Sequence, residues 1–184
     1  MAVPIIVPLV GAIALLVALD GHNPFYSQLR VGRNGKAFRM WKLRSMVHNA
    51  DALLESYLAN NPDSRQEWDT TQKLKQDPRI TFVGRVLRKC SMDELPQLWN
   101  VLNGTMSLVG PRPMMLCQKD SYFGRSYYLV RPGITGPWQV SDRNHCDFID
   151  RVKYDDDYEE AVSFSTDMGL LFKTISVVTR GTGY

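Results

Sequence analysis

Cysteine is scarce in this sequence, and its spacing carries no motif. The 184 residues contain three cysteines, Cys90, Cys117 and Cys146, and no C-x-x-C pair. An odd number of distant thiols does not indicate a disulfide framework, and His145 beside Cys146 has no further ligands at zinc spacing. The cysteines therefore argue against a disulfide-stapled secreted domain and a structural zinc module, and they favour a reducing compartment.

A strong net charge is also missing. Lys and Arg number 22 against 19 Asp and Glu, for a formal net charge of +3, which is too weak to indicate a nucleic-acid partner. The distribution is uneven, however, because no Asp or Glu occurs between Gly21 and Ala50. This basic segment carries about +6 and is expected to face an anionic partner. Its cations are Arg30, Arg33, Lys36, Arg39, Lys42 and Arg44.

Charged side chains are absent from Ala2 to Leu19, AVPIIVPLVGAIALLVAL. As a helix these residues would span about 27 Å, slightly less than a hydrocarbon core of about 30 Å. Prolines interrupt the run, so we predict that residues 1–20 form a re-entrant membrane helix broken at Pro8. The basic segment would then lie at the cytoplasmic surface against anionic lipid. A signal peptide, which lacks its basic start here, and a buried core helix are the alternatives.

Residues 21–184 lack internal repeats and are predicted to form one catalytic domain at the membrane surface. The expected fold class is α+β and mostly helical, with a small β-hairpin. The expected segments are a hairpin strand over 35–43 after a turn at 33–35, a helix ending at residue 60, a polar loop over 62–78, turn-rich segments over 110–144, and a final helix through 168–178.

The stretch SMDELPQLWN at 91–100 places two carboxylates, Asp93 and Glu94, side by side. The spacing from Ser91 to Glu94 has the form of a capping box, which would place the acidic pair in the first turn of a helix. An apolar stripe follows at helical spacing, and Pro96 is tolerated only near the helix start. Helix capping alone would explain the pair, and the rest of the chain adds a chemical explanation. The stripe comprises Leu95, Leu98, Trp99 and Leu102.

Arginines accumulate in or beside the tight-turn segments. The planar guanidinium suits phosphate oxygens, and together with an apolar anchor these residues suggest diphosphate chemistry at a bilayer. In such chemistry one carboxylate can attack phosphorus and another can hold the Mg²⁺ that neutralises the diphosphate. The adjacent carboxylates could divide these two tasks. The arginines are Arg79, Arg85, Arg88, Arg112, Arg131 and Arg143.

Four long segments, in order, resemble those of the bacterial sugar transferases, the monotopic polyprenyl-phosphate sugar-1-phosphate transferases. The central signature is RITFVGRVLRKCSMDELPQLWNVLNGTMSLVGPRP at 79–113. The others are NPFYSQLRVGRNGKAFRMWKLRSM at 23–46, RPGITGPWQVSDRN at 131–144 and YDDDYEEAVSFSTDMGLLFKTI at 154–175. The resemblance covers nearly the whole chain, and four motifs in this order are specific.

The resemblance implies transfer of a hexose-1-phosphate, from UDP-galactose or UDP-glucose, to undecaprenyl phosphate through a covalent phosphosugar intermediate. It implies Asp93 as the nucleophile, Glu94 as the Mg²⁺-associated catalytic partner, and Pro8 as the break in the membrane helix. The implied substrate-binding residues are Arg88, Arg112, Arg79, Lys42, Arg44, Arg131, Gln139, Asn144 and Asp155.

The setting implied is the cytoplasmic face of the bacterial inner membrane, in the first membrane step of exopolysaccharide or glycoconjugate synthesis. The expected partners are a UDP-sugar, undecaprenyl phosphate and membrane lipid, with no nucleic acid and with a homodimer as an open alternative. A membrane scaffold without catalysis and a Mg²⁺-dependent phosphodiesterase stay open as other functions. The intact Asp93 and Glu94 pair argues against the scaffold.

Overall fold

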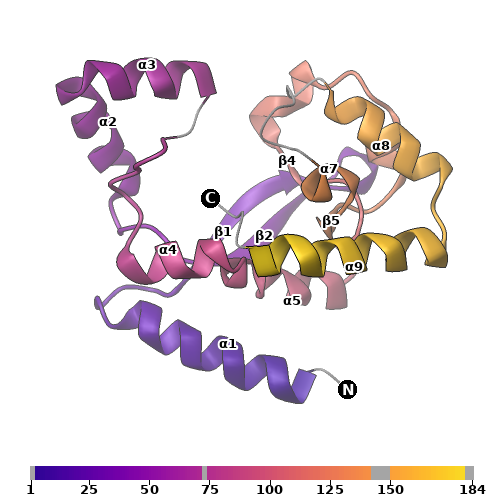
Figure 1. Cartoon of the computed structure of the whole chain (residues 1–184), viewed down its shortest axis with the longest axis horizontal. Coiled ribbons are helices and arrows are strands. Elements are labelled where there is room, and N and C mark those ends of the chain that lie inside the picture. The colour runs from indigo at the N-terminus through magenta and orange to yellow at the C-terminus, as the bar shows by residue number, and fades with distance from the viewer. Residues whose placement is uncertain (1–2, 72–73, 142–149, 181–184) are drawn as a thin grey trace.

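The computed structural model describes residues 3–71, 74–141 and 150–180, which form an α+β fold in which helices surround two small sheets (Figure 1). The predicted fold class is therefore confirmed. The helices are α1 Val3–Ala18, α2 Ala50–Asn60, α3 Pro62–Thr71, α4 Phe82–Lys89, α5 Gln97–Leu102, α6 Ser126–Leu129, α7 Pro137–Val140, α8 Arg151–Glu160 and α9 Phe164–Arg180. The strands are β1 Phe25–Val31, β2 Ala37–Leu43, β3 Ser107–Val109, β4 Met114–Met115 and β5 Gly133–Thr135.

The predicted hairpin is present. Strands β1 and β2 pair antiparallel along their whole length, from Phe25 opposite Leu43 to Val31 opposite Ala37. The turn uses the left-handed backbone conformation, which Asn and Gly adopt more readily than other residues, at Asn34 with a φ of 59° and Gly35 with a φ of 73°. Strand β4 pairs with the other edge of β1, so the sheet order is β2-β1-β4.

Helix α5 covers the outer edge of β2 through a single side chain. The backbone N–H of Trp41 donates to Oδ1 of Asn100 at 3.1 Å, and Nδ2 of Asn100 donates to the carbonyl of Arg39 at 2.7 Å. The amide of Asn100 is almost fully buried and thus takes the place of a neighbouring strand. This contact fixes the hairpin against the segment that carries the acidic pair.

A helix forms in the predicted segment, but the predicted break at Pro8 does not interrupt it. Helix α1 continues across this proline to Ala18. Its inner face packs on Leu43 and Leu87 through Ile13, Ala14 and Val17, while Figure 1 shows it lying against α4 at the edge of the molecule. Within the described ranges, no helix combines the length and the hydrophobicity needed to cross a membrane. The path of this segment in a bilayer stays a prediction.

The polar stretch after residue 61 is not a loop throughout. Residues Pro62–Thr71 form α3, which contacts the predicted helix α2. Pro62 opens the helix, where its missing N–H is harmless, and Arg65 forms ion pairs with Glu55 at 3.6 Å and Asp69 at 4.0 Å. The prediction of a loop over 62–78 was wrong for residues 62–71, because polar composition does not prevent a helix that has a proline start and charge pairs, and it holds for residues 74–78.

The predicted capping box does not form. Ser91 adopts a left-handed conformation with a φ of 54°, and its side chain makes no capping hydrogen bond to any described residue. A 3₁₀ turn over Met92–Glu94 follows, and α5 begins only at Gln97. The reason is that α4 extends to Lys89, so that Ser91 serves as a hinge between two helical segments rather than as a helix start.

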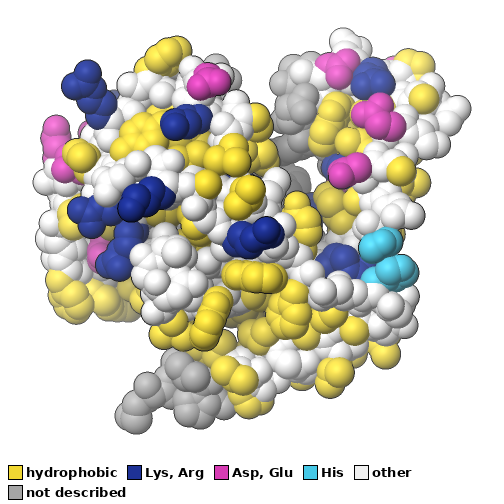
Figure 2. All heavy atoms as spheres, turned by 180° about the vertical axis from the view of Figure 1, so that it is seen from behind, with side chains coloured by type: hydrophobic (Ala, Val, Ile, Leu, Met, Phe, Trp, Pro, Cys, Tyr) yellow, Lys and Arg dark blue, Asp and Glu magenta, His cyan; other side chains and the backbone are white. Residues whose placement is uncertain are grey.

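The apolar stripe is divided between core and surface, because Leu95, just before α5, packs against the cluster of Leu43 and Leu87, whereas the α5 residues Trp99 and Leu102 point outward. Trp99 is 63% exposed and Leu102 is 68% exposed, whereas Gln97 and Asn100 are buried. The final helix α9 is confirmed, and it too leaves apolar side chains, Phe172 among them, at the surface. Figure 2 shows such hydrophobic side chains gathered over the side of the molecule that includes α1. These exposed apolar surfaces are larger than single scattered residues and call for a covering partner.

Candidate active site

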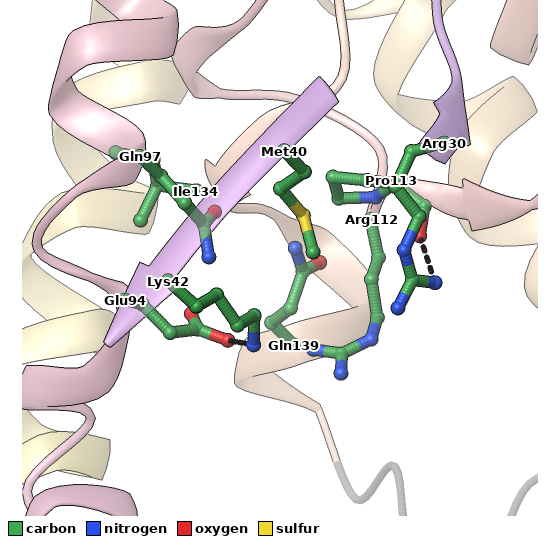
Figure 3. A pocket seen from close by; sticks show the side chains of 9 residues that line it. All are labelled: Arg30, Met40, Lys42, Glu94, Gln97, Arg112, Pro113, Ile134 and Gln139. Carbon is green, nitrogen blue, oxygen red and sulfur yellow. Dashed lines mark hydrogen bonds and ion pairs between the residues drawn. The ribbon is translucent and has the colours of Figure 1, made fainter. Parts of the chain in front are cut away.

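The acidic pair stands next to a lysine from the hairpin. Asp93 and Glu94 lie on the 3₁₀ turn Met92–Glu94, and Lys42 reaches them from β2. Its Nζ is 2.6 Å from Oε1 of Glu94 and 3.9 Å from Oδ2 of Asp93. Figure 3 shows the bond between Lys42 and Glu94 at one wall of a cavity. The structure thus brings these three predicted residues together.

The carboxylate of Asp93 is held in an unusual electrostatic environment. The residue is only 8% exposed, and this burial raises the pKa of its carboxyl above the ordinary value. Lys42 lowers that pKa, adjacent Glu94 raises it, and Arg88 lowers it. A buried carboxylate whose charge depends on two cations is typical of a site that does chemistry.

Arg88 is anchored by the end of the hairpin. Its Nε donates to Oγ of Ser45 at 2.8 Å, and burial lowers the pKa of its guanidinium, while Asp93 and Asp77 raise it. Asp77 is in turn paired with Arg79, at 2.6 Å between Oδ2 and Nη2. Arg79 is therefore connected to the acidic pair only indirectly, through Asp77 and Arg88. Its guanidinium carbon lies 5.0 Å from the ring centre of Trp68.

A small polar cavity separates Glu94 and Lys42 from a second group of cations, and Asp93 is not among its lining residues (Figure 3). Its enclosed volume of about 20 Å³ is enough for about one water-sized group. The lining residues are Arg30, Met40, Lys42, Glu94, Gln97, Arg112, Pro113, Ile134 and Gln139.

Arg112 forms the wall opposite Glu94, and its loop is fixed from behind. Its guanidinium carbon lies 5.8 Å from the ring centre of Trp138, and its carbonyl accepts a hydrogen bond from Arg151. Arg151 pairs with Asp155 at 3.4 Å, and Asp155 accepts a bond from the hydroxyl of Tyr122 at 2.7 Å. Burial raises the pKa of Asp155 to about 6. Asp155 thus supports the loop of Arg112 and does not line the cavity.

Gln139 contributes an unsatisfied amide. The side chain is 7% exposed and lines the cavity, and neither Oε1 nor Nε2 has a hydrogen-bond partner among the described residues. Leaving such a buried amide unpaired costs about 1–3 kcal/mol for each group. The absence of a side chain at Gly136 lets the start of α7 lie close to the Arg112 loop. A Cβ at Gly136 would stand only 2.0 Å from the carbonyl oxygen of Gly110. A bound ligand could satisfy the amide at this position.

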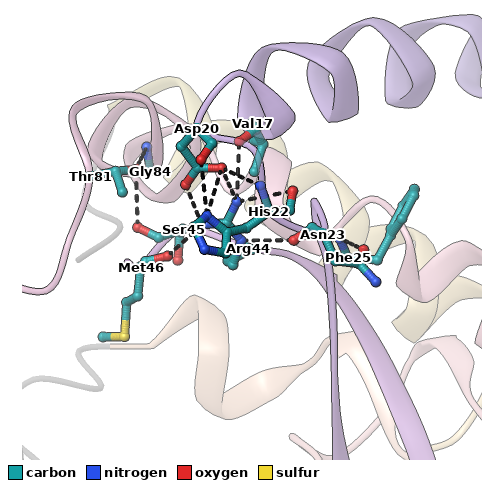
Figure 4. A network of polar contacts seen from close by, with 10 residues as sticks. All are labelled: Val17, Asp20, His22, Asn23, Phe25, Arg44, Ser45, Met46, Thr81 and Gly84. Atoms are coloured by element: carbon teal, nitrogen blue, oxygen red, sulfur yellow. Dashed lines mark hydrogen bonds and ion pairs between the residues drawn. The ribbon is translucent and has the colours of Figure 1, made fainter. Parts of the chain in front are cut away.

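Three predicted residues lie elsewhere or outside the description. Arg44 pairs with Asp20, with Nη2 at 2.6 Å from Oδ1 and Nη1 at 2.7 Å from Oδ2, and also donates to backbone carbonyls (Figure 4). It therefore ties the end of α1 to β2 and does not line the cavity. Arg131 is exposed close to Gly104. Asn144 lies outside the described residues.

Sequence reasoning missed Arg30 and Gln97 as cavity residues. Arg30 belongs to the basic segment, but its position on β1 opposite the Arg112 loop depends on the pairing of β1 with β4, and it donates to the carbonyl of Pro113 at 3.2 Å. Gln97 follows Asp93 by four residues, which was a usable signal, but the apolar stripe suggested that the other face of α5 would be buried.

The acidic pair could hold a metal only together with a ligand. Across the three described ranges, no group of three or more His, Cys, Asp or Glu side chains is placed to bind an ion. Mg²⁺ is commonly bound by one or two protein carboxylates together with substrate phosphates and water. The pair of Asp93 and Glu94 fits this arrangement, with the diphosphate completing the coordination.

Comparisons with known proteins agree on one family. The profile of the bacterial sugar transferase family matches residues 1–181. The chain is 50% identical over 169 residues to the undecaprenyl-phosphate galactose phosphotransferase of Salmonella typhimurium, covering 91% of this chain and 36% of that protein. It is 45% identical over 183 residues to the UDP-galactose-lipid carrier transferase of Erwinia amylovora, covering 98% and 38%.

The chain also matches a relative of which it covers most of the length. The exopolysaccharide production protein ExoY of Rhizobium meliloti is 43% identical over 172 residues, covering 92% of this chain and 76% of that protein. The chain thus spans less than two thirds of the two galactose-transferring relatives and most of this one. On the evidence of the family profile and these identities, the chain belongs to the bacterial sugar transferase family.

Proposed function

We propose that this chain transfers a hexose-1-phosphate from a UDP-sugar to undecaprenyl phosphate and releases UMP. The names of two relatives, which specify galactose or UDP-galactose, support galactose ahead of glucose. The name of the third supports a place in exopolysaccharide production, here as its first membrane step. The reaction would take place at the cytoplasmic face of the inner membrane.

The observation that carries this proposal is that Glu94, next to the buried carboxylate of Asp93, faces arginines across the cavity. Glu94 and Lys42 line one side of the cavity, and Arg112 and Arg30 line the other. Asp93 does not line the cavity, but its Oδ2 is 3.9 Å from Nζ of Lys42. Cations on both sides of a cleft suit a diphosphate, because arginine forms paired, charge-assisted bonds to phosphate oxygens. The amide of Gln139 adds a donor and an acceptor for a further group of the donor substrate.

The proposed mechanism has two displacements at one phosphorus. An Oδ atom of Asp93 forms a bond to the sugar-bearing phosphorus, while the bond from that phosphorus to the bridging oxygen breaks and UMP leaves with the electron pair. An oxygen of undecaprenyl phosphate then attacks the same phosphorus and expels the carboxylate of Asp93. Arg112 would orient the donor phosphates, and Glu94 would hold Mg²⁺. When bound, the ion would neutralise the diphosphate charge.

Membrane attachment is part of the proposal. Residues 1–20 would enter the membrane, and residues 21–184 would lie on its cytoplasmic surface, as a monomer or a homodimer. The large exposed fractions of apolar side chains in the N-terminal segment and on α5 support this placement. These side chains are Val7, Leu15, Leu16, Leu19, Trp99 and Leu102.

The test is UMP release over a panel of UDP-sugars, with and without undecaprenyl phosphate. Wild-type protein should release UMP with UDP-galactose in an acceptor-dependent manner. UMP release that is the same with and without the acceptor would indicate the phosphodiesterase instead. No UMP release with any donor would favour the scaffold.

Variants and trapping assign the acidic pair. Asp93→Asn should abolish both product and adduct, whereas Glu94→Gln should weaken the Mg²⁺ dependence and retain Asp93 as the attachment point. Mixing the enzyme with sugar-labelled donor, omitting the acceptor and mapping the modified peptide by mass spectrometry identifies the nucleophile. A phosphosugar on Glu94, or full turnover by Asp93→Asn, would reverse the assignment.

A further inference from the structure

We infer that Lys42 is a positioning residue that occupies the cation position of the acidic pair until the metal and donor arrive. Its ammonium then leaves Glu94 for the donor diphosphate. This inference rests on the proposed function, since it concerns how the same site admits its ion. It goes further because it assigns two roles to Lys42. The lysine occupies the cation position in the empty site, and it gives up that position to the metal.

The contacts of Lys42 carry the inference. Its Nζ approaches Oε1 of Glu94 to 2.6 Å and lies 3.9 Å from Oδ2 of Asp93, so one ammonium is shared by two neighbouring carboxylates. Adjacent anions repel each other unless a cation is shared. The lysine side chain is largely buried as well, which strengthens its attraction to the pair relative to a surface contact.

The ammonium and a metal ion cannot use Glu94 in the same way. Mg²⁺ binds carboxylate oxygens at about 2.0–2.1 Å and demands near-octahedral geometry. An ammonium already 2.6 Å from Oε1 would stand beside the divalent ion in a partly buried site, where the two positive charges repel. Binding of the metal at Glu94 therefore requires Lys42 to withdraw.

The hairpin leaves only the lysine side chain free to make this exchange. The strand on either side of Lys42 is held by pairing with Tyr26 on β1 and by the bond from Trp41 to Asn100. The flexible stem of Lys42 reaches into the cavity that Arg112 also lines. Diphosphate oxygens lying across that cavity would accept the displaced ammonium.

This exchange would couple three events. The arriving diphosphate withdraws Lys42 from Glu94, the vacated carboxylate receives the metal, and Asp93 loses the ammonium that shields it. Donor and metal would consequently bind with positive coupling, since each favours the same position of Lys42. The nucleophile would remain masked while the site is empty of donor.

The test is direct metal binding without donor. The free Mn²⁺ signal in electron paramagnetic resonance measures the Kd of the purified 184-residue chain for this substitute of Mg²⁺. We expect Lys42→Met to lower the Kd for Mn²⁺ by at least about tenfold, because it removes a competing charge a few ångströms from the ion. Lys36→Met, at the exposed turn end of the same basic segment, is the matched control and should leave the Kd unchanged.

The double variant Lys42→Met/Glu94→Gln tests whether the tighter Mn²⁺ binding occurs at Glu94. It should lose the decrease in Kd that is expected for Lys42→Met. An unchanged or higher Kd for Lys42→Met, or a gain that persists without Glu94, would overturn the inference. Lys42→Gln serves as a second variant if the methionine variant fails to unfold cooperatively. Absence of acceptor-dependent UMP release by the wild type would overturn the proposed function alone, because the metal measurement needs neither donor nor acceptor.

Discussion

Gly84 offers a sharp test of how the scaffold positions the arginine beside the nucleophile. It lies inside α4, and a Cβ added there would stand 1.9 Å from the carbonyl oxygen of Ser45 and 2.6 Å from its carbonyl carbon. Both atoms belong to the backbone, so rotation of a side chain cannot relieve the clash. Gly84→Ala would force the hairpin end and α4 apart (Figure 4).

The expected cost follows from the contacts that would be displaced. Overpacking in a close contact costs about 1–3 kcal/mol, and loss of the hydrogen bond from the Thr81 N–H to the Ser45 carbonyl, 3.1 Å long, adds about 1 kcal/mol. The higher helix propensity of alanine offsets about 1 kcal/mol. Gly84→Ala should therefore lower the free energy of unfolding by about 1–3 kcal/mol.

The matched control is Gly169→Ala in α9, where no described atom lies within 4 Å of the new Cβ. This variant should gain about 0.5–1 kcal/mol in unfolding free energy and keep its activity. Urea unfolding measures both variants, and UMP release should fall in Gly84→Ala even when it is fully folded. The fall is expected because Ser45, which moves, holds Arg88 at 2.8 Å. Equal stability of the two variants would refute the reasoning.

The remaining predictions concern the cavity. Arg112→Lys keeps the charge but loses the planar fork. The value of kcat/KM for the donor should therefore fall by an amount that corresponds to about 1.5–3 kcal/mol of lost binding free energy, and wild-type kinetics would contradict this role. If the substrate satisfies the amide of Gln139, Gln139→Leu should lower kcat/KM for the donor by an amount that corresponds to about 1–3 kcal/mol of lost binding free energy. An unchanged kcat/KM would place the donor elsewhere. Because burial raises the pKa of Asp93 and its anion attacks, kcat/KM should increase as the pH rises through that pKa. Lys42→Met removes a cation that lowers the pKa and should move this limb to higher pH; a shift to lower pH would contradict it.

Local patterns in the sequence predicted those elements whose causes are local. The Asn34-Gly35 pair favours left-handed backbone, and the hairpin turns there as expected. The spacing of apolar residues predicted α2 and α9, since a helix periodicity extends over several turns in both. The basic segment was predicted to lie against anionic lipid, whereas its Lys42 contacts Glu94 at 2.6 Å.

Other features depend on distant partners and were not predictable from local patterns. The apolar stripe included Trp99, which is exposed, while the helix buries Asn100, whose partners on β2 lie about sixty residues earlier in the chain. An apolar side chain at the surface cannot be told from a core residue by spacing alone. Similarly, Ser91 matches a capping box, but the length of α4 decides that it acts as a hinge.

The single amide that borders β2 also affects how copies of this protein can meet. A strand at the edge of a sheet ordinarily presents unpaired N–H and carbonyl groups, which can recruit a strand from another molecule. Here Asn100 occupies the N–H of Trp41 and the carbonyl of Arg39, in the middle of the strand. A second chain could not extend the sheet past this point without first breaking both bonds. The hairpin is thereby protected against edge-to-edge aggregation at the strand that carries Lys42.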